Sequence, residues 1–279
     1  MPLAEPRSVV TGAAGGLGRA FCVEIGRLRG RVLVTDVDED GAEETAELVR
    51  RSGGQARVLG CDVRELAQLE AVAEMATEWF GDVDLLVNNA GVAVGGAVGD
   101  VPLADWRWAI DINLWGVIHG CHVFVPRMKR RRRGYIVNVA SAAGLVSTPE
   151  MAPYNVTKAG VVALSETLYA EVRDLGVRVT VLCPSFFQTN IVDASRGPVP
   201  PKSIELARTL MKNASVQAPG VAQAALRSVA AGELYAVPMR DGRAMWRLQR
   251  AFPGRVGRVL RAATTDGTLI NKLWRRAGV

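Results

Sequence analysis

The chain contains few of the residues that hold metal ions. Its 279 residues include four scattered cysteines and two histidines. The cysteines lack the spacing of a metal site, and both histidines fall in one predicted helix without acidic or cysteine partners at ligand spacing. We therefore predict no metal site and read the cysteines as buried, reduced thiols. The residues concerned are Cys22, Cys61, Cys121, Cys183, His119 and His122.

Signals for membranes and secretion are also missing. No apolar run reaches the roughly 18 residues that span a bilayer. Residues 1–11 show no basic segment followed by a long apolar stretch, as a secretory signal would. Together with the unpaired cysteines, this predicts a cytoplasmic protein.

Positive charge is scarce outside the C-terminal end. The net charge is +6, but residues 240–279 carry ten Lys or Arg against two Asp, a local charge of +8. The remainder must then carry −2, which argues against nucleic acid as a partner. The basic, apolar-studded tail suits a helix that contacts an anionic membrane peripherally, caps a substrate pocket or packs on a partner subunit. These alternatives stay open.

Apolar strand-like runs alternate with longer helical patterns along the chain. Most of the runs are continuously apolar, as in strands buried on both faces of a parallel sheet. This predicts an α/β fold: a doubly wound parallel sheet (Rossmann fold) in three α/β/α layers over residues 1–239, with residues 240–279 as a C-terminal helical extension of the same domain. Residues 185–218, rich in Pro, Ser and Asn, fall outside the pattern. The predicted strands are residues 8–11, 31–36, 56–61, 83–88, 135–139, 178–183 and 235–237, and the predicted helices are residues 41–52, 64–80, 105–129, 153–175 and 220–231.

A glycine-rich turn joins the first predicted strand to a helix. Glycines at such a turn let the backbone approach a pyrophosphate, and the helix N-terminus offers free N–H groups and a partial positive charge. The turn therefore predicts one end of a dinucleotide site. Its candidate cofactor residues are Gly12, Gly15, Gly16, Leu17 and Gly18.

Polar residues follow the next strands at the carboxyl edge of the sheet, where open α/β folds bind ligands. Asp36 ends the second strand, 18 residues beyond Gly18, and an acid near this offset accepts hydrogen bonds from the adenosine ribose. It would repel a 2′-phosphate, and Arg19 is the only base close to the turn, so NAD is favoured over NADP. Further candidates at this edge are Asp62, Val63, Asn89, Ala90 and Gly91.

Tyr154 and Lys158 lie four residues apart in a predicted helix and so project from one face. An ammonium about 4 Å from a phenol contributes on the order of 4 kcal/mol at an effective dielectric of 20. That could lower the tyrosine pKa from about 10 by up to roughly 3 units, before the cost of burial. A phenol so adjusted can act as a general base near neutral pH. Ser141 precedes the pair by 13 residues, just after a strand, and Asn113 lies in an earlier helix.

In this order the motifs resemble the short-chain dehydrogenase/reductase family. The resemblance rests on residues 11–18, Asp62, residues 88–91, Asn113, Ser141 and the Tyr154/Lys158 pair, and covers roughly residues 8–235. It implies hydride transfer between nicotinamide and an alcohol or carbonyl. Tyr154 would exchange the proton, Lys158 would also hold the nicotinamide ribose, Ser141 would hold the substrate oxygen and Asn113 a water. It further implies that Pro184 and Thr189 contact the cofactor, although Ser185 replaces a usual glycine, and that two long helices form a homodimer or homotetramer.

The resemblance places the substrate pocket over the nicotinamide. Apolar candidates for its lining predict a lipophilic secondary alcohol or ketone, although several could simply pack the loop against the domain. An NADP-dependent 3-ketoacyl reductase and a catalytically silent dinucleotide sensor are the alternatives. The candidate lining residues are Leu145, Val146, Met151, Phe186, Phe187, Ile191, Leu206, Leu210 and Met211.

Overall fold

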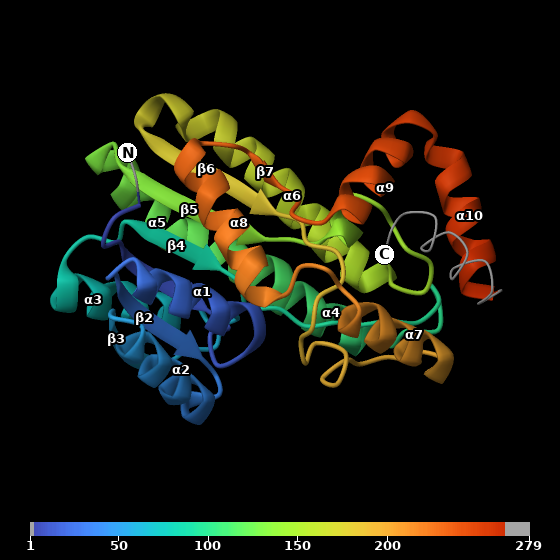
Figure 1. Ribbon diagram of the computed structural model, residues 1–279, viewed down its shortest axis with the longest axis horizontal. Coiled ribbons are helices and arrows are strands. Elements are labelled where there is room, and N and C mark those ends of the chain that lie inside the picture. The colour runs from blue at the N-terminus through green and yellow to red at the C-terminus, as the bar shows by residue number, and fades with distance from the viewer. Residues whose placement is uncertain (1–2, 266–279) are drawn as a thin grey trace.

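The computed structural model describes residues 3–265 (Figure 1). Within them, seven parallel strands form one sheet in the order β3-β2-β1-β4-β5-β6-β7. The chain leaves β1 in one direction toward β3 and later returns to β4 on the other side, so the order reverses between β1 and β4. In such sheets the reversal opens a crevice at the carboxyl ends of the strands. The strands are β1 Arg7–Thr11, β2 Arg31–Asp36, β3 Gln55–Gly60, β4 Leu85–Asn88, β5 Gly134–Val139, β6 Val177–Leu182 and β7 Tyr235–Ala236.

Helices cover both faces of the sheet, which confirms the three-layer Rossmann fold. Helices α1, α2 and α8 lie on one face of the sheet and α3, α5 and α6 on the other (Figure 1). The apolar side chains of each set pack with the face that it covers. Val10 and Val34 point into the first layer, whereas Val9 and Leu33 point into the second, as alternation along a strand requires. These helices are α1 Gly16–Arg27, α2 Glu39–Arg51, α3 Leu66–Phe80, α5 Gly116–Arg131, α6 Ala152–Val172 and α8 Ala218–Ala231.

The predicted helix over residues 105–129 is in fact three segments. Helix α4 (Leu103–Ile110) passes through one π-helical turn (Asp111–Trp115) into α5. A π turn inserts one residue into the hydrogen-bond ladder and often marks a functional position. Apolar periodicity does not reveal it, because the flanking turns keep nearly the same axis.

Three further helices lie in the parts of the chain outside the regular alternation. Helix α7 (Pro201–Lys212) lies within residues 185–218, where the sequence predicted none, and begins with proline at its first position. Helices α9 (Arg240–Ala251) and α10 (Pro253–Thr265) form the predicted C-terminal extension. The last fourteen residues of the tail, including Trp274, lie outside the described residues. No helix between residues 3 and 265 is long and apolar enough to cross a bilayer.

Candidate active site

The glycine turn needs glycine for two different reasons. Gly12 adopts φ +64°, and a Cβ there would lie 2.6 Å from Cα of Ala90, while a Cβ on Gly18 would collide with the carbonyl of Gly12. A Cβ on Gly15, in contrast, would meet no protein atom within 4 Å, because Gly15 borders the cavity. Asn89 holds the turn against β4, since its Nδ2 donates to the carbonyls of Thr11 (3.0 Å) and Gly12 (2.8 Å).

The outer end of the turn is acidic. Asp36 ends β2, and its Oδ2 accepts a hydrogen bond from the Ala14 amide at 2.8 Å. Asp62 follows β3 and pairs with Arg64, which holds the pKa of the Asp62 carboxyl below its usual value. Both aspartates border the cavity, as predicted.

Arg19, the base nearest the turn, is already engaged by the protein. Its NH2 group lies 2.9 Å from Oε2 of Glu44 and 3.2 Å from the carbonyl of Gly41. Its Nε donates to the Thr45 hydroxyl at 2.9 Å. The guanidinium is therefore held against α2.

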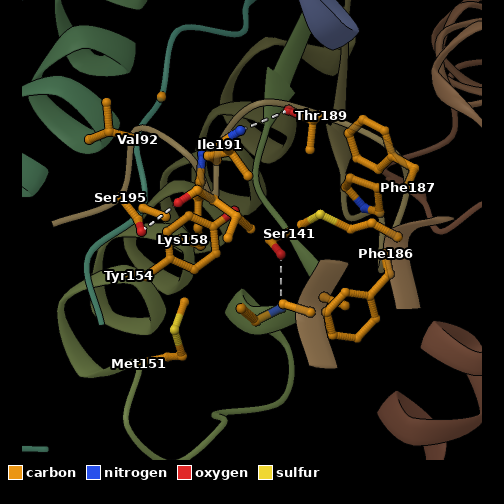
Figure 2. Close-up of a pocket in the computed structure, with 18 of the residues that line it drawn as sticks. Val92, Ser141, Met151, Tyr154, Lys158, Phe186, Phe187, Thr189, Ile191 and Ser195 are labelled. Carbon is orange, nitrogen blue, oxygen red and sulfur yellow. Dashed lines mark hydrogen bonds between the residues drawn. The ribbon is translucent and has the colours of Figure 1, made fainter. Parts of the chain in front are cut away.

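The structure brings Tyr154 and Lys158 together on the cavity side of α6 (Figure 2). The Lys158 Nζ lies 5.7 Å from the centre of the Tyr154 ring and donates to the Val139 carbonyl, at the end of β5, over 3.0 Å. Lys158 is almost wholly buried. One turn of helix separates the two residues, and both side chains border the cavity.

Burial governs the titration of this pair in the protein itself. It raises the pKa of Tyr154, against a smaller lowering by the Ser141 hydroxyl, and it lowers the pKa of Lys158 to about 8. The sequence predicted that Lys158 would lower the tyrosine pKa. The structure shows the opposite net direction, because desolvation disfavours both charged forms and the ammonium is directed at the Val139 carbonyl.

The lowered pKa of Lys158 predicts a pH-dependent stability. The unfolded chain, with a lysine pKa of about 10.5, binds more protons than the folded protein between about pH 8 and pH 10.5, so the contribution of this residue to stability rises across that window. Between pH 7 and pH 10, the free energy of unfolding of the wild type should rise by roughly 2–3 kcal/mol relative to Lys158→Met. Urea denaturation at both pH values measures this change.

The matched control is Lys212→Met, since Lys212 is exposed on α7. The difference in free energy of unfolding between Lys212→Met and the wild type should not change over the same pH range. If the difference in free energy of unfolding between Lys158→Met and the wild type also stayed constant, the buried ammonium would have an ordinary pKa. That result would contradict the lowering of the Lys158 pKa by burial.

Ser141 and Asn113 reach the site from other elements. Ser141 follows β5, borders the cavity, and accepts a hydrogen bond on Oγ from the Ala143 amide at 3.1 Å (Figure 2). Asn113 lies in the π turn and is buried behind the cavity wall. Its Oδ1 accepts from the Val92 amide (2.7 Å), and its Nδ2 donates to the Val92 carbonyl and the Thr157 hydroxyl. The Asn113 side chain thus fixes the chain after β4 to α6, and its predicted role toward a water stays a prediction.

One continuous cavity of about 1840 Å³ contains these groups. A single small-molecule site usually occupies about 300–1,000 Å³, so the cavity has room for two ligands. Every predicted cofactor residue borders it except Gly18, which packs beneath Gly12. Of the predicted substrate-pocket residues, Leu145 alone does not border it and packs against the core instead. Among residues 3–265, no cluster of three or more His, Cys, Asp or Glu could hold a metal.

The residues at this cavity fit a dinucleotide. The open space beside Gly15 lies at the N-terminus of α1, where backbone N–H groups favour phosphate. The Ser185 hydroxyl, at the position where the sequence departs from the expected glycine, is buried at the cavity and has no hydrogen-bond partner among the described residues. A buried polar atom of this kind needs a partner, which a bound ligand can provide.

Comparison with known proteins identifies the family of the chain. The family model described as "short chain dehydrogenase" matches residues 7–198. The chain belongs to the short-chain dehydrogenase family. A short-chain dehydrogenase/reductase from Burkholderia phymatum, solved in complex with NAD, is 34% identical in sequence and superposes with a TM-score of 0.84. The match covers 90% of this chain and 95% of the Burkholderia chain.

Curated relatives in this family match a similar part of the chain. The 3beta-hydroxysteroid dehydrogenase 1 of Eggerthella lenta is 36% identical over 66% of this chain and 71% of its own length. The CLA biosynthesis dehydrogenase/reductase of Lactiplantibacillus plantarum is 32% identical over 65% of this chain and 65% of its own. The match covers only 31% of EphD of Mycobacterium tuberculosis, named as a probable oxidoreductase. Several relatives therefore extend well beyond the matched region.

The sequence did not identify a large part of the cavity wall. Side chains from α9 and α10 contribute to it, including Met245, Leu248 and Val256. The amphipathic pattern of the tail was a signal, but it was equally compatible with a membrane or a partner subunit. Only the position of these helices beside the sheet distinguishes a cavity wall from those alternatives.

Proposed function

We propose that this protein transfers a hydride between NAD(H) and a lipophilic secondary alcohol or ketone. The observation that supports this most is the convergence of Tyr154, Lys158 and Ser141 on a cavity that also contains the glycine turn. When bound, the nicotinamide ring accepts or supplies the hydride, and in its oxidised form its positive charge favours a nearby phenolate.

The residues of the chain perform the other half of the reaction. In the oxidising direction the Tyr154 phenolate takes the proton from the substrate hydroxyl as the hydride leaves the carbon that bears this hydroxyl. In the reducing direction the Tyr154 phenol returns that proton to the carbonyl oxygen. Ser141 donates a hydrogen bond to the substrate oxygen as charge develops there. Lys158, whose Nζ borders the cavity beside the Tyr154 ring, would bind the nicotinamide ribose.

The charges around the glycine turn favour NAD over NADP. Several carboxylates border the cavity near the turn, and the two arginines that border it there are paired, Arg19 with Glu44 and Arg64 with Asp62. A 2′-phosphate would add negative charge beside them without a free guanidinium to pair with. The carboxylates are Asp36, Asp38, Asp40, Glu44 and Asp62.

Asp36→Ala tests this account of cofactor choice. It removes the carboxylate that would meet the adenosine ribose, and we expect the ratio of kcat/KM for NAD over NADP to fall at least about tenfold, a change of roughly 1.4 kcal/mol. Glu43→Ala is the matched control, because Glu43 is an exposed acid of α2 that pairs with Arg50 and does not border the cavity. An unchanged ratio in Asp36→Ala would contradict the proposed role of Asp36.

The apolar cavity wall supports a lipophilic substrate. Met151, Phe186 and Ile191 surround the space next to Tyr154 (Figure 2). The names of two relatives point the same way, one to a hydroxysteroid and one to the biosynthesis of CLA. A screen of lipophilic secondary alcohols with NAD tests the proposal, with 3-ketoacyl thioesters and NADPH as the competing pair. Faster turnover of the thioesters would favour the 3-ketoacyl reductase alternative.

Oligomerisation and localisation are further proposals. A homodimer or homotetramer through the faces of α5 and α6 is supported by apolar side chains exposed in that region, Trp115 just before α5 and Val156 on α6. A cytoplasmic location with peripheral membrane contact through residues 240–279 stays a prediction. Against membrane contact, the apolar sides of α9 and α10 border the cavity.

A further inference from the structure

Helix α9 starts directly beside the active site. A Cβ on Gly242 would lie 3.7 Å from Cβ of Ser185 and 4.0 Å from Cβ of Ala142, the residue after Ser141. The Trp246 ring packs on the Tyr235 ring of β7 with 4.7 Å between centroids. These contacts fix the first half of α9 to the edge of the sheet.

From there α9 extends the cavity away from Tyr154. Its twelve residues are about 18 Å long. Apolar side chains of α9, α10 and the residue between them border the cavity, and α7 contributes apolar residues to the same cavity. Leu248, Phe252 and Val259 are each about half exposed, so among residues 3–265 the wall offers apolar surface that other side chains leave uncovered. The wall residues are Met245, Leu248, Phe252, Val256, Val259 and Leu260 on one side and Leu206, Leu210 and Met211 on α7.

Both helices of this wall are basic along their length. The described part of α9 and α10 carries seven arginines and a single carboxylate, Asp241, which adjoins the inner end at Gly242. Arg255 follows the distal end of α9 and borders the cavity. Its guanidinium lies over the Phe252 ring at 5.5 Å, and no carboxylate between residues 3 and 265 is within ion-pair distance of it.

We propose that the substrate is a long hydrocarbon that carries the secondary alcohol or ketone and ends in an anionic group, a carboxylate or a phosphate. The reacting carbon lies at Tyr154, the hydrocarbon lies between α7 and the wall of α9 and α10, and the anionic end lies at Arg255. This inference rests on the proposed function for its reacting carbon, but the binding site it describes can be tested without turnover.

Isothermal titration calorimetry on the full chain without cofactor tests the charged end. Ricinoleic acid, a hydroxylated fatty acid, should bind about two- to fivefold more tightly than methyl ricinoleate, the range of an exposed ion pair. Arg255→Ala should remove that difference. Arg247→Ala is the matched control, because Arg247 is exposed on α9 and does not border the cavity. Equal affinity of acid and ester for the wild type, or an unchanged preference in Arg255→Ala, overturns the assignment of Arg255.

A second variant tests the wall itself. Leu248→Asp places a charge on a half-exposed position, so the fold should tolerate it, and both ligands should bind tenfold or more weakly. Unchanged affinity for both ligands in this variant overturns the proposal that the hydrocarbon binds along α9 and α10. Lysophosphatidic acid, included as a third ligand, identifies the anionic group as a phosphate if it binds more tightly than ricinoleic acid, and as a carboxylate if it binds less tightly.

Turnover separates this inference from the proposed function. If NAD is reduced with cyclohexanol but ricinoleic acid neither binds nor reacts, the proposed function stands and the substrate class is wrong. If ricinoleic acid binds as described but no alcohol reduces NAD, the binding site stands and the proposed hydride transfer is wrong.

Discussion

Tyr154→Phe is expected to lower kcat by about 10²- to 10⁴-fold, the usual contribution of a general acid or base. Phenylalanine keeps the aromatic ring beside Lys158 but removes the hydroxyl that exchanges the proton with the substrate. Because Lys158 still reaches the Val139 carbonyl, the site should stay intact and the affinity for NAD should change less than twofold. Steady-state kinetics and calorimetric titration with NAD measure the two quantities.

Tyr169→Phe provides the matched control for this change. Tyr169 lies on the same helix, and its hydroxyl donates to the Gly232 carbonyl at 3.4 Å, outside the cavity. This variant should keep wild-type kcat. Turnover in Tyr154→Phe comparable to that of the control would exclude the phenol as the proton carrier.

Gly15→Val is expected to weaken NAD binding by about 10- to 100-fold with little change in stability. Gly15 has φ −160°, an extended conformation that any residue adopts, and a Cβ there meets no protein atom within 4 Å. The added side chain would instead occupy the approach to the N-terminus of α1, displacing one or two charge-assisted hydrogen bonds worth about 1.5–3 kcal/mol each. Titration with NAD measures the loss of affinity, and thermal denaturation without NAD measures the stability.

Gly12→Ala, in contrast, should lower the stability of the protein itself. Its positive φ and the close approach of Ala90 are demanded by the fold, so we expect a loss of roughly 1–3 kcal/mol in stability even without ligand. Wild-type affinity for NAD in Gly15→Val would show that the dinucleotide does not cross this turn, and would remove the main reason for placing it there.

The order of elements was predictable from the sequence because strands buried on both faces leave continuous apolar runs. The second strand, residues 31–36, was predicted to the residue, whereas β4 begins two residues later than predicted. Asp84, just before β4, pairs its side chain with Arg7 at the start of the neighbouring central strand β1, at 2.8 Å, a contact that local periodicity does not encode. Helix α7 escaped prediction because three prolines fall within residues 198–201, two just before the helix and one at its first position, a composition typical of loops.

The candidate site was predictable in its residues but not in its electrostatics. Spacing along a helix was enough to pair Tyr154 with Lys158, since helical geometry is local. The direction of their pKa shifts depends on how deeply the folded chain buries them, which is a property of the whole fold. The same holds for Arg19, whose pairing with Glu44 depends on how α1 packs beside α2.

The most direct test of hydride transfer at this site is the formation of NADH from NAD and a lipophilic secondary alcohol such as ricinoleic acid. The account predicts that the wild type forms NADH and the matching ketone in equal amounts, and that Tyr154→Phe binds NAD but forms neither at a comparable rate. A wild-type protein that binds NAD tightly, yet reduces none of it with any alcohol and oxidises no NADH with any ketone, would contradict the account and indicate a protein that senses the dinucleotide without turning it over.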